Sequence, residues 1–265
     1  MTFVLLLLTG LIVGLISSFF GVGGGVIAIP MLYTTFPKIP PQLAISSSMG
    51  MIFLNSIINI YHFSQSNRRP IFKLAGLMGV GVAIGVITGV YFTTYLNPIQ
   101  LKLIFAIVLF LVSLRLFFSK KSSDTGDQWT ENLDRKEKLK AFLIAFSGGN
   151  LAGLTGLGGG AIMVPMFITI LKMPLKWVPV YSNFVMGCGA LIGVINYMAL
   201  YDTSSFFAKS KFMSFQLGMV NWGIIILITL GSFLTSKVGV KLNEKVPEKI
   251  SKNLFAALLL IFSLK

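Results

Sequence analysis

The sequence predicts an all-α, polytopic integral membrane protein built from two duplicated repeats, and three observations lead to this fold class. Of the 265 residues, 55% are hydrophobic and only 11% are charged, whereas a soluble domain carries about 25% charged residues. The apolar residues gather into runs of about 20 residues, the length that crosses a bilayer as a helix. A glycine-rich motif then occurs once in each half of the chain. This composition excludes an ordinary soluble enzyme and a disordered chain.

The apolar runs predict the helices in order along the chain. The first, 3–20, has no basic n-region and no small-residue cleavage motif, so we expect a retained helix rather than a signal peptide. Runs 26–36 and 161–171 are short and each follows a glycine cluster, so we expect one arm of a broken helix at each. The remaining helices are expected at 43–62, 74–95, 99–118, 139–155, 178–200, 212–236 and 250–264.

A change in composition divides these helices into two groups. Residues 119–138 contain five of the eight acidic residues and no apolar period, which is typical of a solvated linker. The predicted organisation is therefore a first membrane repeat at 1–118, a charged cytoplasmic linker at 119–138 and a second membrane repeat at 139–265.

The two halves resemble each other around their glycine clusters. Gly21–Met31 reads GVGGGVIAIPM and Gly156–Met166 reads GLGGGAIMVPM, so seven of eleven positions are identical. A serine-containing segment that leads into a helix follows both clusters, at 44–48 and 178–182. Because a matched proline and the same order of segments accompany the glycines, we interpret the pattern as an internal duplication, which is common in secondary transporters.

The 22 basic residues predict how the two repeats are oriented. If each glycine cluster is a hairpin tip where the chain turns back, the repeats are inverted and 17 basic residues face the cytoplasm. If the clusters are only kinks, the repeats are parallel and 13 basic residues face the cytoplasm. Because cytoplasmic loops are enriched in Lys and Arg, the inverted arrangement is favoured, with both termini outside. Parallel repeats stay open as the alternative.

Each glycine cluster is expected to present the N-terminus of a short helix. Glycine weakens a helix by about 1 kcal/mol per residue relative to Ala, and irregular backbone at membrane depth is tolerated where it packs in protein or lines a cavity. We expect Pro30 and Pro165 in the first helical turn, where proline is at home. Free N–H groups at a helix N-terminus bind anions, so two such ends would enclose an anion. The alternative is that the glycines only allow close helix packing.

The acidic residues all lie in the linker or in loops, and none interrupts an apolar run. Cation pumps and exporters usually need intramembrane carboxylates, so we expect a neutral or anionic substrate. The chain has one cysteine, Cys188, and one histidine, His62, which excludes an internal disulfide and a metal cluster built from them. No Ser/His pair or paired aspartates are placed for catalysis. We therefore expect no enzyme activity, no cofactor and no metal site.

Polar residues near the glycine clusters complete the expected site. Most polar side chains within apolar runs, such as Asn55 and Asn59, are expected to hydrogen-bond to a neighbouring helix. The better candidates flank a cluster or occur at equivalent places in both halves. Together with the glycines and prolines, the predicted substrate-binding residues are Gly21, Gly23, Gly24, Gly25, Pro30, Ser46, Ser47, Ser48, Asn150, Thr155, Gly156, Gly158, Gly159, Gly160, Pro165, Tyr181, Ser182 and Asn183.

The paired G-x-G-G-G-x-x-x-x-P elements, the small-residue segments after them and the chain length resemble the TauE/SafE family of sulfite and organosulfonate exporters. The resemblance covers both halves. It implies a transporter of sulfur-containing anions in the bacterial cytoplasmic (inner) membrane, with both glycine–proline elements at the site. The family's A-x-G-T-S segment is partly kept: Ser46 and Ser47 replace its Gly and Thr in the first copy, and Val180 and Tyr181 in the second. Its G-N-V-D-W element loses the acid in Gly218–Trp222.

Two classes of function are left open. The first is a secondary transporter that moves a small sulfur-containing anion, such as sulfite or a sulfonate like sulfoacetate, by alternating access. The second is a non-transporting membrane scaffold, assembly factor or sensor on the same fold, which has no need of two anion-binding helix breaks. We expect a small anion and the lipid bilayer as partners and no nucleic acid, with a homodimer as one option for the oligomeric state.

Overall fold

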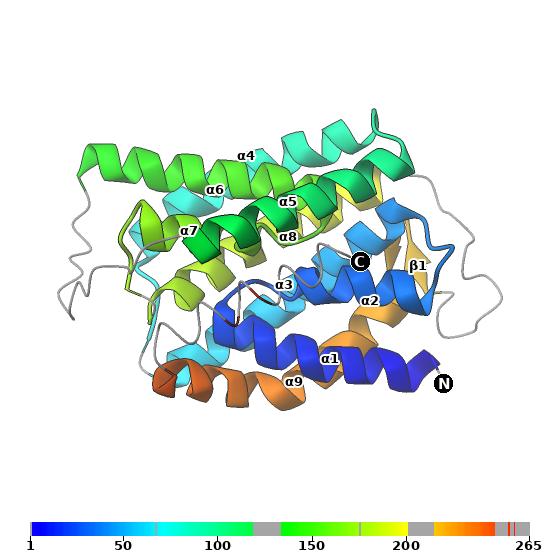
Figure 1. Cartoon of the computed structure of the whole chain (residues 1–265), viewed down its shortest axis with the longest axis horizontal. Coiled ribbons are helices and arrows are strands. Elements are labelled where there is room, and N and C mark those ends of the chain that lie inside the picture. Colours follow the sequence, from blue (N-terminus) through cyan, green and yellow to red (C-terminus); the bar gives the residue numbers. More distant parts are fainter. Residues whose placement is uncertain are drawn as a thin grey trace.

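A computed structural model gives the fold of residues 2–66, 68–118, 134–174, 176–200 and 215–246, together with Leu254 and Ala257. The long helices lie roughly along one direction, and the β-structure within these ranges is a single short hairpin (Figure 1). The predicted all-α class is confirmed.

The first half of the chain forms five helices. Helix α1 (Thr2–Phe20) ends at the first glycine cluster, and α2 (Gly25–Thr35) doubles back from it. Helices α3 (Pro41–Gln65), α4 (Phe72–Thr93) and α5 (Pro98–Phe118) follow.

The second half begins in the same way. Its elements are α6 (Arg135–Thr155), α7 (Gly160–Thr169), α8 (Val178–Leu200), β1 (Gln216–Leu217), β2 (Val220–Asn221) and α9 (Trp222–Lys245). In Figure 1, α1 runs leftward from the N-terminus and α6 runs in the opposite direction.

Two expected boundaries differ from the structure. The run 212–236 was expected to be helical throughout, but α9 begins at Trp222 because an antiparallel hairpin turns at Gly218, whose φ is 57°. The Asn221 side chain then caps α9 by accepting the Ile224 N–H at 3.0 Å. The expected helix 250–264 lies outside the described residues except for Leu254 and Ala257, which are helical.

Helix α6 begins inside the segment expected to be a linker. Asp134 and Glu137 form a capping box, in which Glu137 Oε2 accepts the Asp134 N–H at 3.1 Å. Residues 135–138 are therefore helical. The rest of the linker, 119–133, lies outside the described residues.

Among the described residues, α1, α3, α4, α8 and α9 are long and apolar enough to cross a membrane. The chain is thus a polytopic membrane protein, as predicted. Helices α3 and α8 are the most buried of these spans, with 72% of each span inside the protein against 44–56% for the others. They form the centre of the fold.

Two parallel helix pairs flank this centre, α1 with α9 and α4 with α6. In both pairs the two helices run in the same direction, because higher residue numbers in one helix face higher residue numbers in the other. Glycines at the contacts let the two backbones touch. A Cβ at these glycines would overlap the facing backbone, so Gly81, Gly85 and Gly89 serve packing, as expected for small residues in membrane helices. The facing pairs are Gly10–Ile228, Gly14–Ser232 and Gly239–Leu15 in α1–α9, and Gly81–Phe142, Gly85–Phe146 and Gly89–Asn150 in α4–α6.

Candidate functional site

The two glycine clusters adopt the same backbone conformation. In each cluster three glycines have positive φ, a left-handed conformation that residues with a Cβ rarely adopt. This requirement explains why glycine occupies these positions. The φ values are 71°, 82° and 76° at Gly21, Gly23 and Gly24, and 71°, 77° and 74° at Gly156, Gly158 and Gly159.

A helix N-terminus follows each break. The N–H groups of Ile27 and Ala28 donate to Gly24 O at 3.1 and 3.0 Å, and these are the first helical hydrogen bonds of α2. The N–H groups of Gly25 and Val26 precede them and so have no acceptor within the helix. Gly159 O begins α7 in the same way. Both breaks therefore end in the positive end of a helix dipole.

The two breaks contact each other at the centre of the protein. A Cβ at Gly25 would lie 3.0 Å from the Leu157 backbone, and a Cβ at Gly160 would lie 2.7 Å from Val22 Cα. The structure therefore brings together the two predicted glycine clusters, which are about 135 residues apart in the sequence.

A serine from each central helix holds the opposite break. Ser48 Oγ of α3 donates to Gly156 O at 2.9 Å, and Ser182 Oγ of α8 donates to Gly21 O at 2.7 Å. Both hydroxyls are fully buried. These two predicted site residues do reach the glycine clusters, and each links the two halves of the chain.

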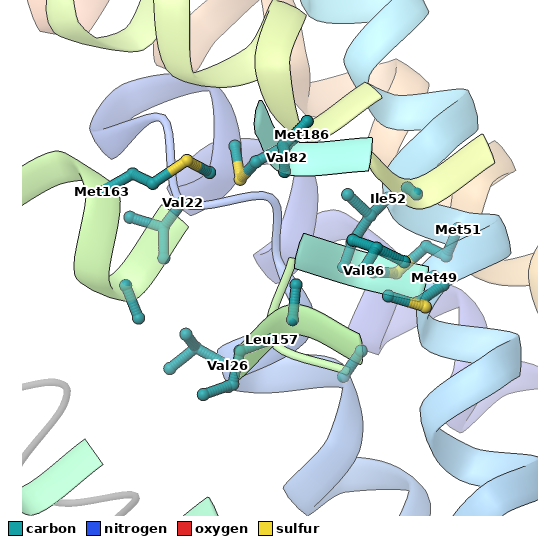
Figure 2. Close-up of a cluster of buried hydrophobic side chains, with 14 of the residues drawn as sticks. Val22, Val26, Met49, Met51, Ile52, Val82, Val86, Leu157, Met163 and Met186 are labelled. Carbon is teal, nitrogen blue, oxygen red and sulfur yellow. The ribbon is translucent and has the colours of Figure 1, made fainter. Parts of the chain in front are cut away.

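Apolar side chains fill the space around the breaks, as Figure 2 shows for Val22, Leu157, Ile52 and Met186. A Cβ at Gly23 would lie 2.9 Å from Met186 Sδ, and a Cβ at Gly158 would lie 2.9 Å from Ile52 Cδ1. The described residues thus form a closed centre in which the helix N-termini are covered.

The two prolines lie deeper in their helices than the sequence suggested. Pro30 and Pro165 are each the sixth residue of α2 and α7, because these helices already begin at Gly25 and Gly160. The prediction of first-turn prolines is therefore wrong. A proline at this depth removes the hydrogen bond that its residue would donate four residues back.

Other predicted site residues make their hydrogen bonds away from the breaks. Ser46 Oγ donates to Met219 O, and Ser47 Oγ accepts the Asn221 N–H at 3.1 Å, so both tie α3 to the β-hairpin. The Tyr181 hydroxyl accepts the Ile71 N–H at 3.1 Å, at the connection between α3 and α4.

Asn150 and Thr155 flank the second cluster. Asn150 Nδ2 donates to Thr88 Oγ1 of α4 at 2.9 Å, which makes it part of the α4–α6 contact. Thr155 Oγ1 donates to Leu151 O at 2.6 Å and accepts the Leu157 N–H at 3.4 Å. Thr155 therefore helps to shape the second break.

The profile of the family described as "Sulfite exporter TauE/SafE" matches residues 6–265. The chain belongs to the TauE/SafE family. A Haemophilus influenzae "Probable membrane transporter protein" is 29% identical over 261 residues, covering 97% of this chain and 93% of that protein. No solved structure matches.

Two further relatives of the TauE/SafE chain have the same description. A probable membrane transporter of Methanocaldococcus jannaschii is 27% identical, covering 98% of this chain and 93% of its own length. The Bacillus subtilis probable membrane transporter YunE is 25% identical, covering 94% and 91%. The protein is thus a membrane transporter.

One departure of this TauE/SafE chain from the family pattern has a structural counterpart. Asn221 stands where the resemblance leads us to expect an aspartate. Its amide oxygen caps α9, a role that Asn and Asp perform equally well. The acid is therefore not needed to begin this helix.

Sequence reasoning missed a buried polar network beside the first break. Asn59 Nδ2 of α3 donates to Ser17 Oγ of α1 at 3.3 Å and to Asn183 Oδ1 of α8 at 2.9 Å. Asn183 in turn donates to Pro179 O at 2.7 Å. Only Asn183 was a predicted site residue. Ser17 and Asn59 were not predicted, because the candidates were chosen to flank a glycine cluster or to occur at equivalent places in both halves.

Proposed function

We propose that this TauE/SafE protein is a secondary transporter that moves a small sulfur-containing oxyanion, such as sulfite or a sulfonate, by alternating access. The observation that supports this most strongly is the meeting of the α2 and α7 N-termini at the centre of the fold. Helix N–H groups that have no acceptor within their own helix favour anions. The basic side chains of the described residues lie outside the breaks, so the two helix N-termini supply the positive charge that an anion needs there.

The distribution of acidic residues supports an anionic cargo. In the described part of the chain, carboxylates occur at Asp134, Glu137 and Glu244, at the ends of α6 and α9. A cation at the central breaks would therefore have no counter-charge, whereas an anion would meet two helix dipoles of the favourable sign.

Alternating access requires that the closed centre opens. The two breaks are held by the cross-bonds from Ser48 and Ser182 and are covered by Ile52 and Met186. We propose that rocking of one half against the other exposes the helix N-termini to one side of the membrane at a time, as in transporters built from inverted repeats. The opposite directions of α1 and α6 support this arrangement.

The basic residues support the proposed orientation. In the described ranges, Lys38 and Lys102 lie near one end of the helices, and a much larger basic group lies in connections and adjoining turns at the other. We propose that this second end is cytoplasmic, because Lys and Arg accumulate there. The group comprises Arg68, Arg69, Lys73, Arg135, Lys136, Lys138, Lys140, Lys172, Lys176, Lys237, Lys241 and Lys245.

A flux screen tests this function. Purified protein in proteoliposomes is assayed with sulfite, sulfate, thiosulfate, sulfoacetate and acetate, and with an organic cation as the opposite-charge control. We expect saturable flux of at least one sulfur oxyanion and background flux of the cation. Background flux of every anion would contradict the proposal and favour a sensor or scaffold on this fold.

A further inference from the structure

Matched contacts identify equivalent positions in the two halves. Ser48 of α3 donates a hydrogen bond to Gly156 O, and Ser182 of α8 donates the matching hydrogen bond to Gly21 O. Positions in α3 therefore correspond to positions 134 residues later in α8. Gly14 of α1 packs on Ser232, whereas Gly149, its equivalent in α6, packs on Val82. Positions in α4 therefore correspond to positions 150 residues later in α9.

This correspondence shows that the surroundings of the two breaks are chemically unequal. Six buried positions on the side of the first break carry hydroxyls or amides, and each has an apolar or glycine equivalent on the side of the second. The pairs are Ser17 and Ala152, Asn55 and Gly189, Asn59 and Gly193, Asn183 and Met49, Ser232 and Val82, and Ser236 and Val86.

The six equivalent positions on the second side carry hydrocarbon side chains or no side chain, and the buried Thr155 hydroxyl near this break already donates to Leu151 O. A Cβ at Gly189 would lie 2.8 Å from one Val82 methyl and 3.3 Å from a Val86 methyl, and Gly193 packs against Met49. Figure 2 shows Met49, Val82 and Val86 among the apolar side chains of the core. An oxyanion on this side would meet no side-chain hydrogen-bond donor from the six equivalent positions.

The first side contains unpaired polar atoms. The side chain of Asn55 is 1% exposed, and neither its Nδ2 nor its Oδ1 has a hydrogen-bond partner among the described residues. The hydroxyl of the adjacent Ser56 is equally buried and unpaired. Buried amides nearly always find a partner because leaving one unpaired is unfavourable. The Ser56 hydroxyl lies toward α8, 3.6 Å from where a Cβ at Gly187 would be, so the Asn55 amide is the group that has the properties of an empty ligand-binding site.

Asn55 faces the first break. It lies one helical turn after Met51, whose methyl carbon would be 3.5 Å from a Cβ at Gly24, and one turn before Asn59, which bonds Ser17. Residues four apart lie on the same face of a helix. The Asn55 amide thus lies on the α3 face that borders the end of α1 and the break leading into α2.

We propose that the oxyanion binds at the first break only, held by the α2 N-terminus and by Asn55, and that the second break is an apolar gate. This inference rests on the proposed transport function and names the half of the centre that binds. Asn55 Nδ2 donates to an anion oxygen, and Oδ1 accepts from an O–H, so a hydrated or singly protonated oxyanion satisfies both. The site lies toward the end of α3 that precedes Arg68.

Thermal melting of the purified full-length protein, with sulfite and sulfoacetate titrated separately, tests this proposal. Asn55→Leu removes the unpaired amide, so its anion-free melting temperature should equal or exceed that of the wild type. Its affinity for the anion that stabilises the wild type should fall at least tenfold. Ser56→Ala removes the neighbouring unpaired hydroxyl, which lies toward Gly187 of α8, so this variant should keep wild-type affinity. The control is Asn196→Leu, whose amide donates to Ile192 O of its own helix at 2.8 Å, and it should keep wild-type affinity.

Each contrary outcome has a distinct meaning. Wild-type affinity in Asn55→Leu, or in Asn55→Ala if the first variant does not fold, would overturn the inference while leaving the transport function intact. A lowered anion-free melting temperature in Asn55→Leu would also overturn it, because the amide would then be paired in the free protein. A wild type that neither anion stabilises, and that shows background flux of every anion in the screen, would overturn the proposed function together with the inference.

Discussion

Replacing Gly24 with alanine tests the geometry of the first break. At a φ of 76° a β-carbon costs about 1–2 kcal/mol. The added carbon would also lie 2.5 Å from Val13 Cγ1, and such overpacking in a core typically costs about 1–3 kcal/mol. The two effects together predict a loss of about 2–5 kcal/mol, a large share of the roughly 5–15 kcal/mol by which a domain is stable.

Thermal melting in detergent measures this loss. Since 1 kcal/mol corresponds to roughly 2–4 °C for a chain of this size, Gly24→Ala should melt on the order of 10 °C below the wild type. Gly76→Ala is the matched control, because Gly76 lies within α4 and an added Cβ would have no neighbour within 4 Å. It should melt at or slightly above the wild type.

A double variant separates the two causes. Adding Val13→Ala to Gly24→Ala removes the overlapping methyl but keeps the backbone strain, so only the steric part of the loss should be recovered relative to Val13→Ala alone. If Gly24→Ala melts as high as Gly76→Ala, the left-handed break and its packing on α1 are refuted.

Three further outcomes follow from the same structure. Ser48→Ala and Ser182→Ala should each cost about 1–3 kcal/mol, because each leaves a buried glycine carbonyl unpaired; a normal melting temperature for either would show that its cross-bond is dispensable. On a Cys188→Ser background, Lys38→Cys should react with an impermeant thiol reagent on intact cells and Ser122→Cys should not, and labelling of Ser122→Cys from outside would refute the inverted orientation. In proteoliposomes that transport sulfite, the flux of an organic cation should stay at background. Comparable rates for the cation and for sulfite would contradict an anion site.

The sequence was sufficient to locate the breaks because their conformation is a local property. Gly23 and Gly158 need positive φ, so glycine at these positions is visible without any tertiary information. Ser48 and Ser182 were found because the duplication places them at equivalent points. The helices were found because membrane-spanning length and apolarity are also local.

Tertiary packing was not visible in the same way. Ser46 and Ser47 lie beside Ser48, but one residue along a helix turns the side chain by about 100°, which directs these two hydroxyls to the β-hairpin. The depth of Pro30 depends on where α2 begins, which the glycine run alone did not set. Asn55 and Asn59 were set aside because a polar group in a membrane helix usually bonds to a neighbouring helix. Asn59 does so, whereas the Asn55 amide has no partner among the described residues. Both have glycine equivalents in α8, and this asymmetry is the basis of the further inference.

The position of a bound anion tests the central claim most directly. Selenite resembles sulfite, and its selenium can be located by anomalous scattering in crystals of the full-length protein. We expect selenium beside the N-terminus of α2, with oxygens within hydrogen-bond distance of the Gly25 and Val26 N–H groups and of Asn55. Selenium found instead beside Gly193 and Val86, or only among the basic residues at the helix ends, would contradict it.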